Sequence, residues 1–280
     1  MYRGPSRGQG IGSMMHGVAA TLALAPLFDR TACVAWRTFE RAWSQHHRCP
    51  PKSEYFIAPE GTSTAVLTDA VVERWSFDES AREPLPEALL SGNRSAVVMH
   101  GDGGARHGSS ETRLEFPFSP HPELAALLGH PRRVVVHLRL GDPHEPSRRG
   151  ILREDRALEL LQAMLPADAY VLSDSDEVYG ALCHRFECPS WRAIPHSAER
   201  EMRVAHHRGA AHQRESLQAW ADWAAIRSAM SLVLHTPSAF SESALRFSSA
   251  ASCELLDHAS LAECAERAKE GAPSNGRVEL

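Results

Sequence analysis

Residues 132–142 read RRVVVHLRLGD, and this stretch constrains the fold more than any other. Val134, Val135 and Val136 are consecutive β-branched residues before a glycine turn, which is typical of a central strand in a parallel sheet. In open α/β sheets, ligands bind just beyond the carboxyl ends of such strands. The polar loop that follows therefore predicts a ligand site. The local pattern fits equally well a strand that ends in a solvated loop with a structural Arg–Asp pair.

The second half of the chain alternates between short apolar strands and amphipathic helices. Strands are predicted at 134–136, 170–174, 191–194 and 232–234, and helices at 154–164, 177–186, 217–229 and 242–247. Strands that alternate with helices in this way form a parallel doubly wound sheet. We therefore predict an α/β protein.

The first half opens with a glycine-rich loop, residues 8–17, before an apolar helix at 18–27. Glycines before a helix let backbone amides approach an anion, although a tight turn explains them as well. Strands are predicted at 31–36 and 95–100, and a short helix at 122–128. A proline-rich loop from residue 116 places a domain boundary near residues 117–130.

Charge and hydropathy narrow the function classes. The net charge of −5 over 280 residues argues against a general binder of nucleic acid or of anionic membranes. Any affinity for phosphate must then come from a few placed arginines. No segment has the length and charge-free character of a membrane span, and the apolar stretch at 18–27 is interpreted as a buried helix.

Cysteines and histidines give weaker signals. The chain has 6 cysteines and no C-x-x-C pattern. Cys183 and Cys188 are close enough in sequence to bridge a small loop, but buried thiols are the expected state of the cysteines. His206, His207 and His212 lack the spacing of a metal-binding helix, so we expect a solvated loop and no metal.

Three polar loops follow predicted strands and should meet at one edge of the sheet. They are residues 137–142, 173–176 and 236–241. The serines of the third loop, together with Arg139, form a candidate diphosphate clamp. Asp174 and Asp222 are candidates for hydrogen bonds to a base edge or a ribose, or else are helix caps or members of ion pairs. Trp220 and Trp223, which flank Asp222, are expected to pack in the core.

These motifs resemble those of the GT-B fucosyltransferases, a group that includes the α1,2- and α1,6-enzymes, the nodulation and xyloglucan types and the protein O-fucosyltransferases. His137-Leu138-Arg139-Leu140-Gly141-Asp142 is similar to their H-x-R-x-G/T-D motif. Residues 172–178 are similar to a second motif at a strand end. Asp222 followed by the loop 238–241 resembles the third. Gly10-Ile11-Gly12-Ser13 resembles their N-terminal glycine loop, which precedes a helix and a strand like that at 34–36.

The resemblance implies a fold of two Rossmann-like domains. The expected division is an N-terminal, acceptor-side domain over 1–125, a nucleotide-sugar domain over 126–250, and a C-terminal helix or tail over 251–280. It also implies transfer of fucose from GDP-fucose to a glycan or protein hydroxyl, with inversion and without an obligatory metal or another cofactor. The partners would be the donor and a glycan or glycoprotein acceptor, with no nucleic acid.

The resemblance further assigns residues to the site. Arg139 would neutralise the diphosphate, His137 and Asp222 would contact the guanine or its ribose, and Asp174 would help to hold the nucleotide. Glu145 is the candidate general base. The full GDP-sugar set is Gly10, Gly12, Ser13, His137, Arg139, Asp142, Asp174, Asp222, Ser238, Ala239, Phe240 and Ser241.

The sequence also departs from the family. Leu140 stands where many members have a second arginine, and Ser13 stands where they have asparagine. These departures favour a non-catalytic binder of GDP-sugars or glycans as the alternative, and a transferase that uses another sugar nucleotide is a further one. The compartment stays open: the secretory lumen if a leader or anchor precedes this chain, and the cytoplasm otherwise.

Overall fold

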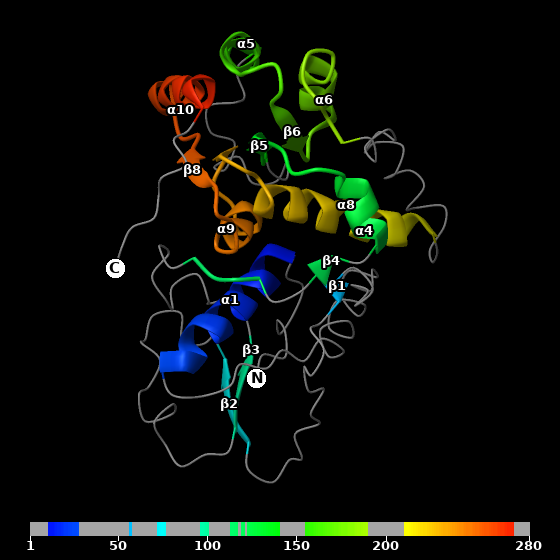
Figure 1. Ribbon diagram of the computed structural model, residues 1–280, viewed down its shortest axis with the longest axis vertical. Helices are drawn as coiled ribbons and strands as arrows, with labels where there is room; N and C mark the ends of the chain where they lie inside the picture. Colours follow the sequence, from blue (N-terminus) through cyan, green and yellow to red (C-terminus); the bar gives the residue numbers. More distant parts are fainter. Residues whose placement is uncertain are drawn as a thin grey trace.

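A parallel sheet forms the centre of the described structure (Figure 1). The computed structural model describes residues 11–27, 56–57, 72–76, 96–100, 113–116, 119–120, 122–140, 155–189 and 210–271. The strands are β5 (Val134–Leu138), β6 (Tyr170–Ser173), β7 (Leu232–His235) and β8 (Ala251–Glu254), in the order β6-β5-β7-β8. All pairs are parallel, which confirms the α/β fold class with a parallel sheet.

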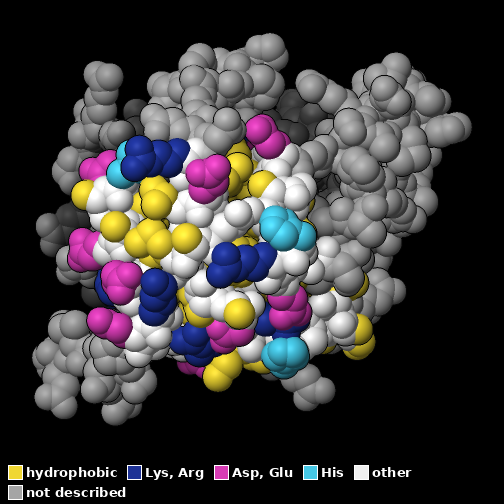
Figure 2. Space-filling model, turned by 90° about the horizontal axis from the view of Figure 1, so that it is seen from above, with side chains coloured by type: hydrophobic (Ala, Val, Ile, Leu, Met, Phe, Trp, Pro, Cys, Tyr) yellow, Lys and Arg dark blue, Asp and Glu magenta, His cyan; other side chains and the backbone are white. Residues whose placement is uncertain are grey.

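One face of the sheet is covered by α5 (Asp155–Met164), α6 (Asp176–Leu182) and α10 (His258–Glu270). Alternate residues of β5, namely Val134, Val136 and Leu138, point into this layer because successive side chains of a strand point to opposite faces. The outer surface of this layer mixes acidic and basic side chains (Figure 2), with ion pairs such as Arg133–Asp168. The layer therefore offers no single-sign field that would attract an anion.

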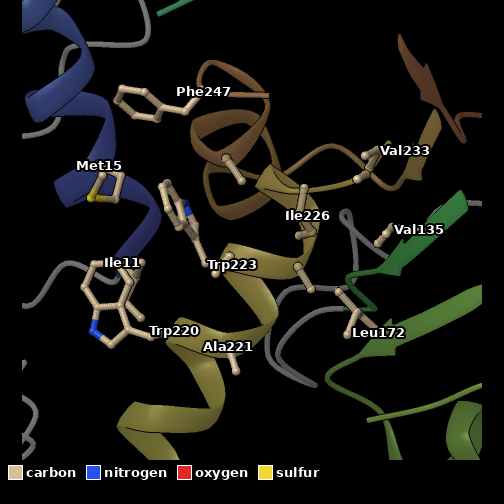
Figure 3. Close-up of a cluster of buried hydrophobic side chains, with 14 of the residues drawn as sticks. Ile11, Met15, Val135, Leu172, Trp220, Ala221, Trp223, Ile226, Val233 and Phe247 are labelled. Carbon is tan, nitrogen blue, oxygen red and sulfur yellow. The ribbon is translucent and has the colours of Figure 1, made fainter. Parts of the chain in front are cut away.

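The other face is covered by α8 (Ala210–Arg227), α9 (Ala239–Leu245) and α1 (Ile11–Leu27). Ile11 and Met15 of α1 meet Trp220 and Trp223 of α8 (Figure 3), and both tryptophans are fully buried. Their burial confirms that they are core residues, and each ring removes roughly 150–250 Å² from water. The short helix α4 (Pro122–Leu128) packs on α8, and its bounds match the prediction.

The first half contributes small pieces of sheet. β2 (Val72–Ser76) and β3 (Ala96–His100) pair in parallel, and β1 (Phe56–Ile57) pairs antiparallel with β4 (Ser119–Pro120). Helix α1 contacts both β3 and α9 (Figure 1), so it connects the first half of the chain to the second. The strands predicted at 31–36 and 191–194 lie outside the described residues.

The sheet continues past the expected limit at residue 250. β8 pairs with β7, and α10 packs on α5, so the segment expected to be a C-terminal helix or tail supplies a strand and a helix to this layered unit. The strand was not predicted because Ala251-Ser252-Cys253-Glu254 has no β-branched residue. It forms because Cys253 is buried against α10 while Ser252 and Glu254 face outward. Within the described ranges, no helix is long and apolar enough to cross a bilayer.

The expectation of buried thiols is wrong for two pairs of cysteines. Cys183 is bonded to Cys188, with their Cα atoms 5.6 Å apart, and Cys253 is bonded to Cys264, with their Cα atoms 5.8 Å apart. Both separations fit disulfide geometry. The second bond ties β8 to α10. It could not be predicted because only the packing of α10 on the sheet brings these two residues together.

These disulfides predict a pattern of thiol protection. In unreduced, denatured protein, Cys183, Cys188, Cys253 and Cys264 should resist alkylation, and all four should react after reduction. Peptide mass spectrometry with differential alkylation measures this directly. Labelling of Cys253 and Cys264 without reduction would contradict the cross-link between β8 and α10.

Candidate functional site

Three strands end side by side where the polar loops were predicted. Leu138 of β5 is in register with Ser173 of β6, and His137 with His235 of β7. The residues that follow these strands, Arg139, Asp174 and Thr236, are therefore brought together at the carboxyl edge of the sheet. This is the edge at which open α/β sheets bind ligands.

Arg139 and Asp174 form an ion pair across the ends of β5 and β6. The Arg139 Nη1 lies 3.1 Å from the Asp174 Oδ2, and the Asp174 Oδ1 accepts a hydrogen bond of 2.9 Å from the Leu140 amide. Of the alternatives open for Asp174, the structure shows the ion pair. The Arg139 side chain remains 46% exposed, so its guanidinium is held in place and still accessible to an anion.

Thr236 fixes the backbone of Arg139. Its Oγ1 accepts a hydrogen bond of 2.6 Å from the Arg139 amide and donates one of 3.2 Å to the Arg139 carbonyl. Thr236 is buried, so this pair of bonds is shielded from water. Sequence reasoning placed Thr236 in the third loop and gave it no role. Its role could have been inferred from its position, because Thr236 carries a hydroxyl directly after β7, the strand next to β5.

The serine loop forms the turn before α9. Ser238 caps the helix, and its Oγ accepts a hydrogen bond of 3.2 Å from the Ser241 amide. Ser241 is 0% exposed, and its hydroxyl bonds within the turn, to the Ser238 carbonyl at 3.1 Å. Ser241 therefore shapes the turn, whereas Ser238 and Ala239 lie at its surface.

His137 and Phe240 join β5 to α9. Their rings stack with centroids 5.4 Å apart, and His137 is buried. The contact sets the position of the serine turn relative to Arg139. Two residues that were predicted separately to bind the nucleotide thus pack on each other.

Gly12 brings the start of α1 against the start of α9. A Cβ built on Gly12 would lie 2.5 Å from the Ala239 carbonyl carbon and 2.5 Å from the Phe240 amide nitrogen. Both atoms are backbone, so neither can turn away. The prediction of a loop over 8–17 is wrong from Ile11 onward, where the chain is already helical, because the first turn of α1 packs against α9. Gly12 of that turn lies against the serine loop, and glycine is required because the two helices touch here.

Gly12→Ala should separate α1 from α9. Overpacking against backbone costs about 1–3 kcal/mol, so the free energy of unfolding should fall by that amount in urea titrations. Gly180→Ala in α6 is the matched control. A Cβ there meets nothing within 4 Å, so alanine should raise stability by about 0.5–1 kcal/mol. Equal stability of the two variants would contradict the close contact.

Solved fucosyltransferase structures resemble this chain in fold. No protein-family model matches the chain, and no curated protein matches it in sequence. A fucosyltransferase NodZ from Bradyrhizobium superposes with a TM-score of 0.51 at 15% identity, covering 89% of this chain and 93% of that one. A NodZ α-1,6-fucosyltransferase co-crystallised with GDP gives 0.51 at 14% identity, over 89% and 92%. The chain has a fucosyltransferase-like fold.

A plant enzyme supports the same conclusion. A mutant of Arabidopsis thaliana FUT1 in complex with GDP superposes with a TM-score of 0.51 at 10% identity. The match covers 91% of this chain and 70% of that one. At such identities the likeness concerns the fold, and the roles of individual residues remain predictions.

The fucosyltransferase-like fold brings together only part of the predicted site. Gly10, Asp142 and Glu145 lie outside the described residues, and Ser13 is described only as part of the backbone of α1. Asp222 is buried on α8, and burial, followed by the charge of Asp222, raises the pKa of Tyr170, which begins β6. Asp222 is therefore near the start of a strand whose end carries Asp174. Its contact with a nucleotide stays a prediction.

Two buried histidines near the site were not singled out from the sequence. His16 on α1 is 3% exposed, and burial together with the charge of Arg246 lowers its pKa to about 4. His235 at the end of β7 is also buried, which lowers its pKa to about 4. Both are therefore neutral at pH 7. In the described part of the chain, no group of three His, Cys, Asp or Glu side chains converges as metal ligands would.

The two histidines predict loss of stability in mild acid. Their folded pKa of about 4 lies below the usual 6.5, so the unfolded chain binds the protons first as the pH falls. Stability is full above about 6.5 and declines toward pH 4, by on the order of 3 kcal/mol for each histidine. Urea titrations at several pH values measure this decline. His235→Leu should reduce it, whereas His184→Gln, at an exposed site, should not.

Proposed function

We propose that this chain is a glycosyltransferase that transfers fucose from GDP-fucose to a hydroxyl of a glycan or protein, with inversion and without an obligatory metal. The fucosyltransferase-like fold supports the reaction class. One of the similar enzymes was crystallised with GDP, which supports a guanine nucleotide as the donor group. The observation that carries the proposal is Arg139, fixed by Asp174 and Thr236 at the ligand-binding edge of the sheet.

We also propose the two-domain GT-B arrangement, divided near residues 125 and 126. Helix α1 belongs to the first half and touches α9 of the second through Gly12. The donor would lie at the carboxyl edge of the sheet, and the acceptor would enter between the two halves. The disulfides support an oxidising compartment such as the secretory lumen, because cytosolic thiols are kept reduced.

In this mechanism Arg139 binds the diphosphate of the donor. The acceptor oxygen attacks the sugar C1 from the face opposite the phosphate and loses its proton to a base. The C1–O bond to the phosphate breaks, and its electron pair leaves on GDP. A guanidinium that is already in place stabilises the charge that develops on the leaving diphosphate, usually the largest catalytic contribution. The turn at Ser238 would present its hydroxyl and amides to the same group.

A second candidate is a binder of GDP-sugars without turnover. Leu140 favours it, because its partly buried side chain packs against the apolar cluster between the sheet and the layer of α5, α6 and α10. Where many relatives offer a second guanidinium, this chain offers an apolar side chain. A binder would hold GDP without releasing it from GDP-fucose, and a transferase for another sugar nucleotide would bind UDP or ADP better than GDP.

GDP should stabilise the purified protein, and Arg139→Ala should weaken GDP binding about 10- to 100-fold, as loss of hydrogen bonds to a charged group implies. Thermal shift and titration calorimetry with GDP, UDP and ADP measure both effects. The matched control is Arg156→Ala. Arg156 is an exposed arginine of α5, away from the strand ends, and this variant should bind GDP like the wild type. No stabilisation by GDP, together with no effect of Arg139→Ala, would overturn the proposal.

A further inference from the structure

Glu242 lies on α9 beside the candidate diphosphate site. Its amide donates a hydrogen bond of 2.9 Å to the Ser238 carbonyl, so it stands one turn along from the residue that caps the helix. Its side chain is 46% exposed and thus open to a substrate. Because α9 packs on α1 (Figure 1), Glu242 also lies at the contact between the two halves of the chain.

His16 lies behind Glu242 on α1. Its Nε2 is 3.9 Å from the Glu242 Oε2, and the imidazole is 3% exposed. Neither ring nitrogen has a partner at ordinary hydrogen-bond geometry in the described structure, and the backbone of Ala239 is the nearby polar group that opposes the lowering of the His16 pKa. Leaving a buried polar group unsatisfied costs roughly 1–3 kcal/mol. A small movement of the half-exposed Glu242 side chain would give His16 an acceptor for its N–H.

The surroundings of Glu242 oppose its ionisation. Partial burial, and then the charge of Glu254 at the end of β8, raise the pKa of its carboxyl. Arg246, one turn further along α9, is buried and lowers the pKa of His16. A carboxylate of raised pKa is a stronger base than an ordinary surface glutamate.

We propose that Glu242 is the general base of the transfer and that His16 positions its carboxylate. This inference rests on the proposed function. The acceptor O–H gives its proton to Glu242 as the oxygen forms its bond to the sugar C1. The bond from C1 to the phosphate breaks, and the electron pair leaves with GDP. Neutral His16 donates its N–H to the carboxylate and so directs the free oxygen toward the acceptor.

Turnover of GDP-fucose with water as the acceptor tests this without knowledge of the natural acceptor. Glu242→Gln should lower the kcat of GDP release about 10²- to 10⁴-fold and leave the Kd for GDP within about twofold, because the donor is held by Arg139. Glu263→Gln, an exposed glutamate of α10, is the matched control and should keep wild-type turnover. Glu145→Gln tests the base expected from the family pattern.

The pH profile separates catalysis from a structural role. Glu254→Gln removes the charge that opposes ionisation of Glu242, so the acid limb of kcat should move to lower pH. His16→Leu removes the N–H donor, so the acid limb should move to higher pH and kcat should fall. His16→Gln keeps a donor and should recover part of both. If the acid limb of the kcat profile stays at the same pH in all these variants, His16 and Glu242 serve only in packing.

The outcomes distinguish this inference from the proposed function. Absence of GDP binding by the wild type defeats the proposed function itself. Normal GDP binding with full turnover in Glu242→Gln, or loss of turnover only in Glu145→Gln, overturns the role of Glu242 and leaves the proposed function standing. A wild-type protein that binds GDP and releases none from GDP-fucose also overturns it, since Glu242 then has no reaction to catalyse.

Discussion

The position of β5 between β6 and β7 determines most of the described structure. Its five residues are all buried, and alternate side chains supply both helical layers. A shift by one residue would turn His137 into the apolar layer formed by α5, α6 and α10. Both neighbours are parallel to it. Three strands must therefore end together, which brings Arg139, Asp174 and Thr236 to one edge before any ligand is present. Packing alone thus prepares the site.

The contact at Gly12 places α1, from the first half of the chain, next to α9 at that edge of the sheet. Backbone lies against backbone there, with no room for a side chain between the starts of α1 and α9. The tryptophans of α8 pack against Ile11 and Met15 of α1 (Figure 3). A substrate bound at Arg139 would therefore meet groups from both halves. His16 and Glu242 face each other as a consequence of the same contact.

Sequence patterns predicted what local chemistry determines. The valines of β5 and the apolar spacing of α5 each carry their own signal, and so does Arg139 at a strand end. Long-range packing determined the rest. β8 has no β-branched residue, and its disulfide to α10 depends on the finished layer. The proximity of Asp222 to Tyr170 depends on how α8 packs on the sheet, which a lone aspartate between two tryptophans does not reveal.

Leu140 shows how one apolar residue limits the chemistry of this edge. Its amide donates a hydrogen bond to Asp174, while its side chain packs against the cluster beneath α5, α6 and α10. The described part of the loop therefore offers Arg139 as its cation. Asp174 already holds that guanidinium, and an incoming diphosphate must share it with the carboxylate. Binding is then a competition between two anions for one arginine. In the proposed reaction, Asp174 would restore the pair as the diphosphate leaves, which would favour release of GDP.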